Sequence, residues 1–132
     1  MTKKETIDIQ PLLKTKYLLE KALQEGTSSE LEEMGGVQAF EMAYELSWKT
    51  LKKMLMSKGV EVYSPKETFR KAVAEGLIHE FEAWGEKYLE TRNLTVHSYK
   101  EDILADVWKV LPEFLKDLEY LITKVQEEIN KK

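Results

Sequence analysis

Residues 37–55 read VQAFEMAYELSWKTLKKML, and this stretch decides the fold. Its large apolar side chains recur every three or four positions, at Val37, Phe40, Tyr44, Trp48, Leu51 and Leu55. That period is typical of one face of an α-helix. Lysines occupy the other side, at Lys49, Lys52 and Lys53. We therefore predict an amphipathic helix that buries the apolar face, preceded by a loop that closes at Gly35-Gly36.

Helical spacing continues on both sides of this stretch. From Ile7 to Glu25 apolar residues recur at the same period, and Gly26-Thr27-Ser28-Ser29 ends the pattern, which predicts a first helix. Ser64-Pro65-Lys66-Glu67 is a helix start, since serine accepts a backbone N–H, proline fits the first turn and glutamate completes a capping box. We expect this short third helix to run to about Gly76.

Two further helices complete the predicted fold. The fourth carries Phe81, Trp84, Tyr88 and Leu89 on one stripe, which leads to the charged Arg92. The last runs from about Ser98 to the C-terminus, with a kink expected at Pro112. Val60-Glu61-Val62-Tyr63 is too short to carry a sheet. The sequence predicts an all-α, antiparallel up-and-down bundle of four to five helices, in a single domain over residues 1–132.

Composition limits the classes of function. The chain has 132 residues, 42% of them hydrophobic, a formal net charge of −4, no cysteine and two histidines. We therefore expect no disulfide, no thiolate or imidazole-rich metal site, and no cofactor. The acidic balance argues against a broad basic face for nucleic acid. Because no apolar run is long enough to span a membrane and the start, residues 1–5, leads into no signal-like core, we expect a cytoplasmic location.

Residues 92–99 read RNLTVHSY and carry the chemistry. Arginine binds phosphate, histidine moves protons near neutral pH, and tyrosine offers a hydroxyl. On an unbroken helix, Arg92 and His97 would point about 140° apart. We therefore predict a helix break between Asn93 and Ser98, with Ser98-Tyr99-Lys100-Glu101 as a second capping box. The turn would then aim Arg92 and His97 into one groove.

Several motifs together resemble a known family. The chain from about residue 36 to 110 resembles the nucleotidyltransferase substrate-binding proteins of the HEPN superfamily, and the residues that carry the resemblance are Phe40-Glu41-x-x-Tyr44-Glu45-Leu46-x-Trp48-Lys49-x-Leu51, Ser64-Pro65, Ala72, Gly76-Leu77-Ile78, Trp84 and Arg92-Asn93 to His97-x-Tyr99. The resemblance implies an HEPN-like helical bundle, a homodimer, and a minimal nucleotidyltransferase encoded beside it as its partner.

The resemblance also implies roles for the motif. In related HEPN toxins the matching arginine and histidine serve a metal-independent endoribonuclease, which would assign catalysis to Arg92 and His97. The matching tyrosine is a site to which the partner attaches AMP, which would make Tyr99 the acceptor. Asn93 would be a supporting site residue.

Metal-independent cleavage of RNA places demands that one chain does not meet. The reaction needs a base for the 2′-hydroxyl, an acid for the departing 5′-oxygen, and a cation for the charge of the transition state. One chain offers one suitable histidine, His97. Across a two-fold axis, two copies of His97 and of Arg92 would face one groove. We therefore expect activity to require a dimer, and AMP on Tyr99 to switch it off.

Each site residue also has a structural reading. Arg92 would pair with Glu90 or another carboxylate at a helix end, and His97 would be a helix-entry residue. Asn93 would be a C-cap, because asparagine tolerates left-handed backbone conformations. Tyr99 would be an aromatic anchor at the start of the last helix.

Other polar residues and the large aromatic ones favour structural roles. For Glu41 and Glu45, four residues apart, the spacing favours a solvated face or pairing with Lys49 over a divalent cation site. His79 is expected at the surface. The aromatic residues on the apolar stripes are expected in the core or a dimer interface, namely Tyr44, Trp48, Trp84 and Trp108.

Three functions from different classes remain open from sequence. The first is a toxin-like ribonuclease that its partner holds in check. The second is a non-catalytic subunit that presents a nucleotide or other substrate to the nucleotidyltransferase. The third is a structural interaction module. RNA or a nucleotide is the expected ligand of the first two.

Overall fold

The computed structural model describes residues 7–131, and all of its regular structure is helical. The elements are α1 (Gln10–Glu25), α2 (Glu30–Ser57), α3 (Pro65–Ala74), the π-helix η2 (Glu82–Lys87), α4 (Tyr88–His97) and α5 (Glu101–Asn130). Within this range no strand occurs, so the all-α prediction is confirmed. Residues 1–5, for which we expect no signal peptide, and Lys132 lie outside the described residues.

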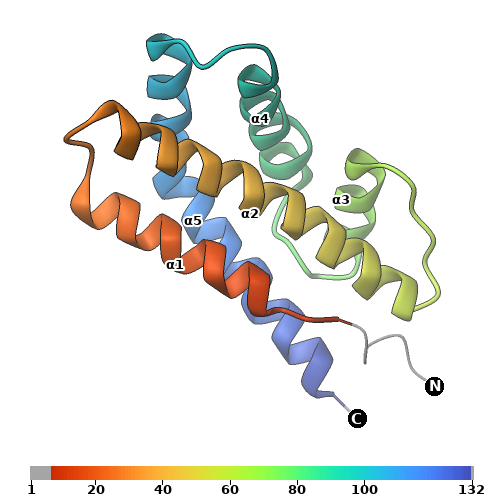
Figure 1. Ribbon diagram of the computed structural model, residues 1–132. Coiled ribbons are helices and arrows are strands. Elements are labelled where there is room, and N and C mark those ends of the chain that lie inside the picture. Colours follow the sequence, from red (N-terminus) through yellow and green to blue (C-terminus); the bar gives the residue numbers. More distant parts are fainter. Residues whose placement is uncertain (1–6, 132) are drawn as a thin grey trace.

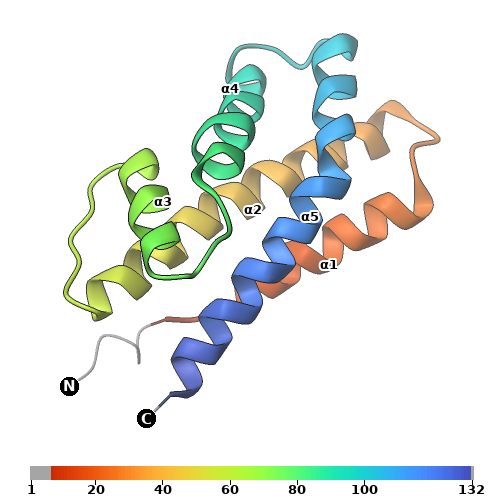
Figure 2. The ribbon, with the colours of Figure 1, turned by 180° about the vertical axis from the view of Figure 1, so that it is seen from behind.

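The helices surround one hydrophobic core. α1 and α2 lie side by side and antiparallel, and α5 packs against both of them from behind (Figure 1). The opposite view shows α5 in front, with α4 antiparallel to its first half and α3 beside the second half of α2 (Figure 2). The start of α1 and the end of α5 lie at the same end of the molecule (Figures 1 and 2). The predicted antiparallel bundle is confirmed.

The centre of the core is a cluster of aromatic rings with Trp84 at its middle. The Trp84 ring centroid lies 5.3 to 6.4 Å from those of four neighbours, Tyr44, Phe69, Tyr88 and Phe114. All five side chains are buried. Tyr88 and Phe114 meet Trp84 edge to face, and each such pair adds about 0.5–1.5 kcal/mol to the free energy of burial. This cluster joins α2, α3, η2, α4 and α5, and so fixes where α4 begins.

The loop predicted at Gly35-Gly36 is wrong, because α2 already begins at Glu30. Ser29 caps the helix by accepting the backbone N–H of Glu32, 3.1 Å away. The second glycine has a packing role instead. A β-carbon on Gly36 would lie 2.4 Å from the indole ring of Trp108 on α5. The glycine therefore permits close approach of α5 to α2 and is not a turn residue.

The other helix ends follow local sequence signals. Ser64 accepts the Glu67 backbone N–H as predicted, while the Glu67 carboxylate accepts the backbone N–H of Tyr63, one residue before the cap. α3 ends at Ala74, close to the predicted Gly76. α5 continues through Pro112 as one helix.

None of the helices in the part of the chain that the structure describes combines the length and the apolar composition needed to cross a membrane.

Candidate functional site

The candidate site lies where α4 faces the middle of α2. α4 places Thr91 and Thr95 inward, and both are buried. The Thr91 hydroxyl donates to the carbonyl oxygen of Lys87, the last residue of η2, at 2.8 Å. The Thr95 hydroxyl shares its one proton between the Arg92 carbonyl, 2.8 Å away, and the Glu41 carboxylate. With threonines at the inward positions, Arg92 comes to the edge of the interface. It is half-buried.

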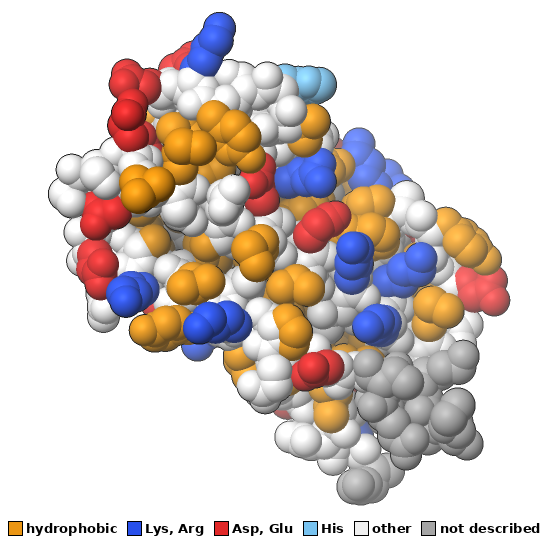
Figure 3. Space-filling view, viewed as in Figure 1, with side chains coloured by type: hydrophobic (Ala, Val, Ile, Leu, Met, Phe, Trp, Pro, Cys, Tyr) orange, Lys and Arg blue, Asp and Glu red, His pale blue; other side chains and the backbone are white. Residues whose placement is uncertain are grey.

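Arg92 borders two adjoining hollows. One, of about 450 Å³, is lined by α2 and α4, with apolar walls and two carboxylates: Glu41, Met42, Glu45, Leu46, Arg92 and Val96. The other, of about 150 Å³, is lined by Tyr44, Glu45, Trp48, Pro65, Leu89 and Arg92. In the view of Figure 3, hydrophobic side chains lie exposed over α2 among side chains of both charges. The guanidinium thus lies beside an open surface depression.

No ion pair among residues 7–131 includes Arg92, so the predicted alternative of a pair with Glu90 is wrong. The charge of Arg92 affects the pKa of the Tyr44 phenol in the core. Burial and the charge of Glu45 raise the pKa of Tyr44, and the positive charge of Arg92 opposes that rise. Arg92 therefore brings to the edge of the core a guanidinium that forms no ion pair with the described residues, which suits it to bind a phosphate.

The helix break predicted between Asn93 and Ser98 is wrong. α4 continues to His97, and the chain leaves the helix only at Ser98. Thr95 and Val96 do not interrupt it, because Thr95 packs inward against α2. On this unbroken helix Arg92 and His97 point about 140° apart. His97 is exposed and lines neither hollow beside Arg92. One chain therefore does not bring the two side chains into one groove.

The second predicted capping box is also wrong. α5 begins at Glu101 with Lys100 as its N-cap residue, and no side chain caps it. The Ser98 hydroxyl accepts the Lys100 backbone N–H at 3.1 Å and so stabilises the connection between α4 and α5. Asn93 is exposed in the middle of α4, so its predicted alternative as a C-cap is wrong.

Tyr99 lies in the connection between α4 and α5 and contacts α2. Its hydroxyl donates toward the Glu41 carboxylate, 3.2 Å from Oε1 and 3.3 Å from Oε2, while its side chain remains 42% exposed. Partial burial, the charge of Glu41 and this hydrogen bond raise the pKa of Tyr99. The phenol is thus held at the surface with its proton on it.

Glu41 is the site residue that sequence reasoning missed. It is half-buried, and it accepts hydrogen bonds from the hydroxyls of Thr95 and Tyr99. The predicted solvated face or pairing with Lys49 is wrong for Glu41. It is wrong for Glu45 too, whose carboxylate accepts the indole N–H of Trp48 at 2.9 Å. Partners 54 and 58 residues away leave no local signal in the sequence.

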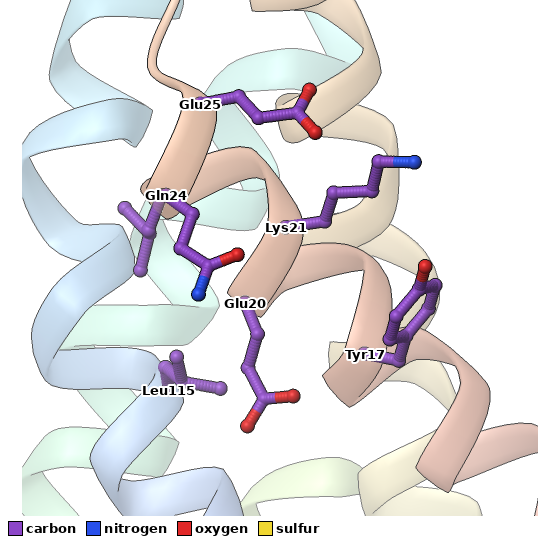
Figure 4. Close-up of a pocket in the computed structure, with 7 residues that line it drawn as sticks. Tyr17, Glu20, Lys21, Gln24, Glu25 and Leu115 are labelled. Atoms are coloured by element: carbon purple, nitrogen blue, oxygen red, sulfur yellow. The ribbon is translucent and has the colours of Figure 1, made fainter.

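A larger hollow, of about 720 Å³, lies elsewhere, on the outer face of α1. It is lined by α1 and Leu115 of α5, and Figure 4 shows the α1 side chains fanning out in different directions. It contains none of the predicted site residues. No group of three or more histidine, aspartate and glutamate side chains in residues 7–131 is arranged to hold a metal ion.

Comparison with known proteins assigns the family. Residues 7–127 match the family described as nucleotidyltransferase substrate binding protein like. The chain belongs to this family. It is 30% identical over 98 residues to the probable ribonuclease HepT of Haemophilus influenzae, a match that covers 70% of this chain and 66% of the relative, just under two thirds of its length.

Two solved structures share the fold. One, from Haemophilus influenzae, is described as the fold of a substrate binding domain of a nucleotidyltransferase. It has a TM-score of 0.80 and 25% identity, and the match covers 90% of this chain and 99% of the other. The second, from Thermus thermophilus, has a TM-score of 0.74 and 28% identity, with 91% and 99% covered.

Proposed function

We propose that this chain forms a homodimeric, metal-independent endoribonuclease that a minimal nucleotidyltransferase controls, as toxin and antitoxin. Membership of the nucleotidyltransferase substrate-binding family supports the partner, and the name of the ribonuclease relative supports the reaction. The observation that carries the proposal is the half-buried Arg92, which borders the 450 Å³ hollow without an ion pair among the described residues. Because its substrates are RNA and ATP, we expect this complex in the cytoplasm.

The divergence of Arg92 and His97 on α4 makes the second copy necessary. In the proposed dimer, the α4 helices of two copies meet at a two-fold axis, so that each Arg92 faces the His97 of the partner subunit across one groove. Two imidazoles are then present, one to accept a proton and one to donate it. A single chain lacks this constellation.

The proposed reaction is an internal transfer of the phosphodiester. One His97 takes the proton of the 2′-hydroxyl, whose oxygen bonds to phosphorus. The bond from phosphorus to the 5′-oxygen breaks, and that oxygen takes a proton from the second His97. Arg92 stabilises the extra negative charge on the phosphoryl oxygens. Asn93, exposed one residue after Arg92, supports the bound strand by hydrogen bonds. The products carry 2′,3′-cyclic phosphate and 5′-hydroxyl ends.

Tyr99 is the proposed point of control. It is exposed in the connection that follows His97, where a second protein has access to it. The nucleotidyltransferase would attach AMP from ATP to the phenol oxygen. The added phosphate and nucleoside would bring negative charge and bulk beside the groove, which would exclude RNA.

Cleavage of RNA in excess chelator tests the ribonuclease. We expect 2′,3′-cyclic phosphate ends from the wild type, and a rate about 10²–10⁴-fold lower in His97→Ala. Co-expressed Arg92→Ala and His97→Ala chains give a heterodimer that keeps one arginine and one histidine on different subunits. Because this heterodimer keeps one imidazole where the proposed reaction uses two, we expect it to cleave far more slowly than the wild type. Absence of cleavage by a well-folded wild-type dimer would refute the proposal.

A non-catalytic subunit that presents a nucleotide to the partner enzyme is the second candidate. It is favoured by a specific observation, since Arg92 borders an open hollow that His97 does not line. In that case the dimer leaves RNA intact, and Arg92→Ala weakens nucleotide binding, as calorimetry would measure.

A further inference from the structure

Glu41 and Tyr99 form a contact that the proposed ribonuclease does not use. Both carboxylate oxygens lie within 3.3 Å of the phenol oxygen. A phenol is a weak nucleophile while it keeps its proton, and its ordinary pKa is about 10. Burial and the neighbouring carboxylate raise the pKa of Tyr99 further. Tyr99 therefore needs a base before it can attack phosphorus near neutral pH.

We propose that Glu41 accepts the phenol proton of Tyr99 when the partner transfers AMP to it. This inference rests on the proposed role of Tyr99 as the AMP acceptor. The phenol oxygen bonds to the α-phosphorus of ATP, and the bond from that phosphorus to the oxygen bridging to the β-phosphorus breaks. Pyrophosphate leaves, and the phenol proton passes to the Glu41 carboxylate and then to water. The acceptor protein thus supplies the base for its own modification.

The surroundings of Glu41 suit this role. No ion pair in residues 7–131 includes Glu41, so no cation holds its negative charge. The Thr95 hydroxyl, buried between α4 and α2, also donates to Glu41, which fixes the direction of the carboxylate. The phenol therefore meets a carboxylate whose direction is fixed.

The other groups near Tyr99 are less suited than Glu41 to accept its proton. Glu45, one turn further along α2, already accepts a hydrogen bond from the indole N–H of Trp48. Among the described residues, the Tyr99 hydroxyl forms its hydrogen bond with Glu41 and not with His97. Glu41 is the carboxylate in reach of the proton that has to leave.

The test measures the initial rate of AMP incorporation by intact mass, with the cognate nucleotidyltransferase, ATP and magnesium. Glu41→Gln keeps the size of the side chain and an oxygen that accepts the hydrogen bond of Tyr99, but it is not a base. We expect its rate to fall at least about 100-fold, the lower end of the usual contribution of a general base. Glu41→Asp restores a carboxylate and should recover part of the rate.

Glu90→Gln is the matched control. Glu90 is exposed on α4, two residues before Arg92, and lines neither hollow, so the variant removes one negative charge without touching Tyr99. We expect its rate to stay within about twofold of wild type. Thermal unfolding of each variant shows that the bundle is intact.

A pH profile separates proton acceptance from positioning. Without its base, Glu41→Gln depends on the phenolate, so its rate should rise about tenfold per pH unit up to the pKa of Tyr99. If Glu41 only positions the phenol, Glu41→Gln keeps the wild-type rate and profile, and the inference is overturned.

The two proposals fail in different ways. An unmodified wild-type Tyr99 in the presence of an active partner overturns the acceptor role, and the role of Glu41 falls with it. A modified wild type together with an unimpaired Glu41→Gln variant overturns the role of Glu41 alone.

Discussion

The two ends of the segment that runs through η2 and α4 are built in different ways. At its first end Trp84 is 1% exposed and packs against four aromatic rings. At its second end, which we call the polar end, the hydroxyls of Thr95 and of Tyr99, just beyond α4, donate hydrogen bonds to the carboxylate of Glu41 on α2. Val96 at this end is 57% exposed.

The difference indicates that the aromatic end contributes most of the stability, while the polar end carries the proposed site. Burial of one large apolar side chain contributes about 1.5–3 kcal/mol, whereas an ordinary hydrogen bond contributes about 0.5–1.5 kcal/mol net. The aromatic end therefore holds α4 in place, and the polar end remains accessible to a ligand or a partner. Mutations at the two ends should accordingly affect different measurements.

Trp84→Ala has the largest expected effect on folding. Loss of the ring leaves a cavity among side chains that already fill the core, so we expect the free energy of unfolding to fall by about 3–5 kcal/mol. His97→Ala, at the exposed end, should change it by less than about 0.5 kcal/mol. Urea denaturation of both variants measures the contrast, and equal losses would contradict the separation.

Gly36→Ala tests the packed region where α2 meets α5. The new methyl group would overlap the Trp108 ring, which is held by a bond from its indole N–H to the Glu33 carbonyl, 2.9 Å away. We expect a loss of about 1–3 kcal/mol, despite the better helix propensity of alanine. Gly35→Ala is the control, since nothing lies within 4 Å of its added β-carbon. An equal loss in both variants would refute the packing role of Gly36.

The packed region was predictable from sequence because its signals are local. Helical periodicity identified α2 from residues 37–55, and the capping residues located the start of α3. The prediction of a loop at Gly35-Gly36 is wrong, because local sequence does not distinguish a glycine in a turn from a glycine that leaves space for an aromatic ring of a distant helix. Trp108, which decides between the two, is 72 residues further along the chain than Gly36.

The polar end was less predictable because its contacts are not local. Composition and spacing predict a site at Arg92, His97 and Tyr99, but the predicted helix break before Ser98 does not form, although β-branched Thr95 has a low intrinsic preference for a helix. In the structure Thr95 is buried against α2, which outweighs that intrinsic preference. The prediction of a solvated face or a pair with Lys49 for Glu41 is wrong for the same reason, since only the packing of α4 on α2 brings Glu41 to Tyr99.

Thr95→Val tests the polar end itself, with an intermediate effect. Valine keeps the shape of threonine but gives Glu41 no hydrogen bond, so we expect a loss of about 1 kcal/mol in the free energy of unfolding. A double-mutant cycle with Glu41→Ala, which removes the acceptor, should show coupling between the two sites. Strictly additive losses would mean that the contact contributes nothing to stability.

Tyr99→Phe gives the smallest effect, which appears as pH dependence. Partial burial and Glu41 raise the pKa of Tyr99, so from about pH 10 upward the unfolded chain releases this proton before the folded one does. The contribution of Tyr99 to stability is therefore complete below about pH 10 and is lost as the pH rises through the folded-state pKa.

Urea midpoints of wild type and Tyr99→Phe, measured from about pH 8 to pH 11, should converge at the alkaline end, because the buried Tyr44 and Tyr88 titrate alike in both proteins. A constant difference across this range would show that Glu41 and Tyr99 are not coupled in the folded protein, and the polar end would then be held by Thr95 alone.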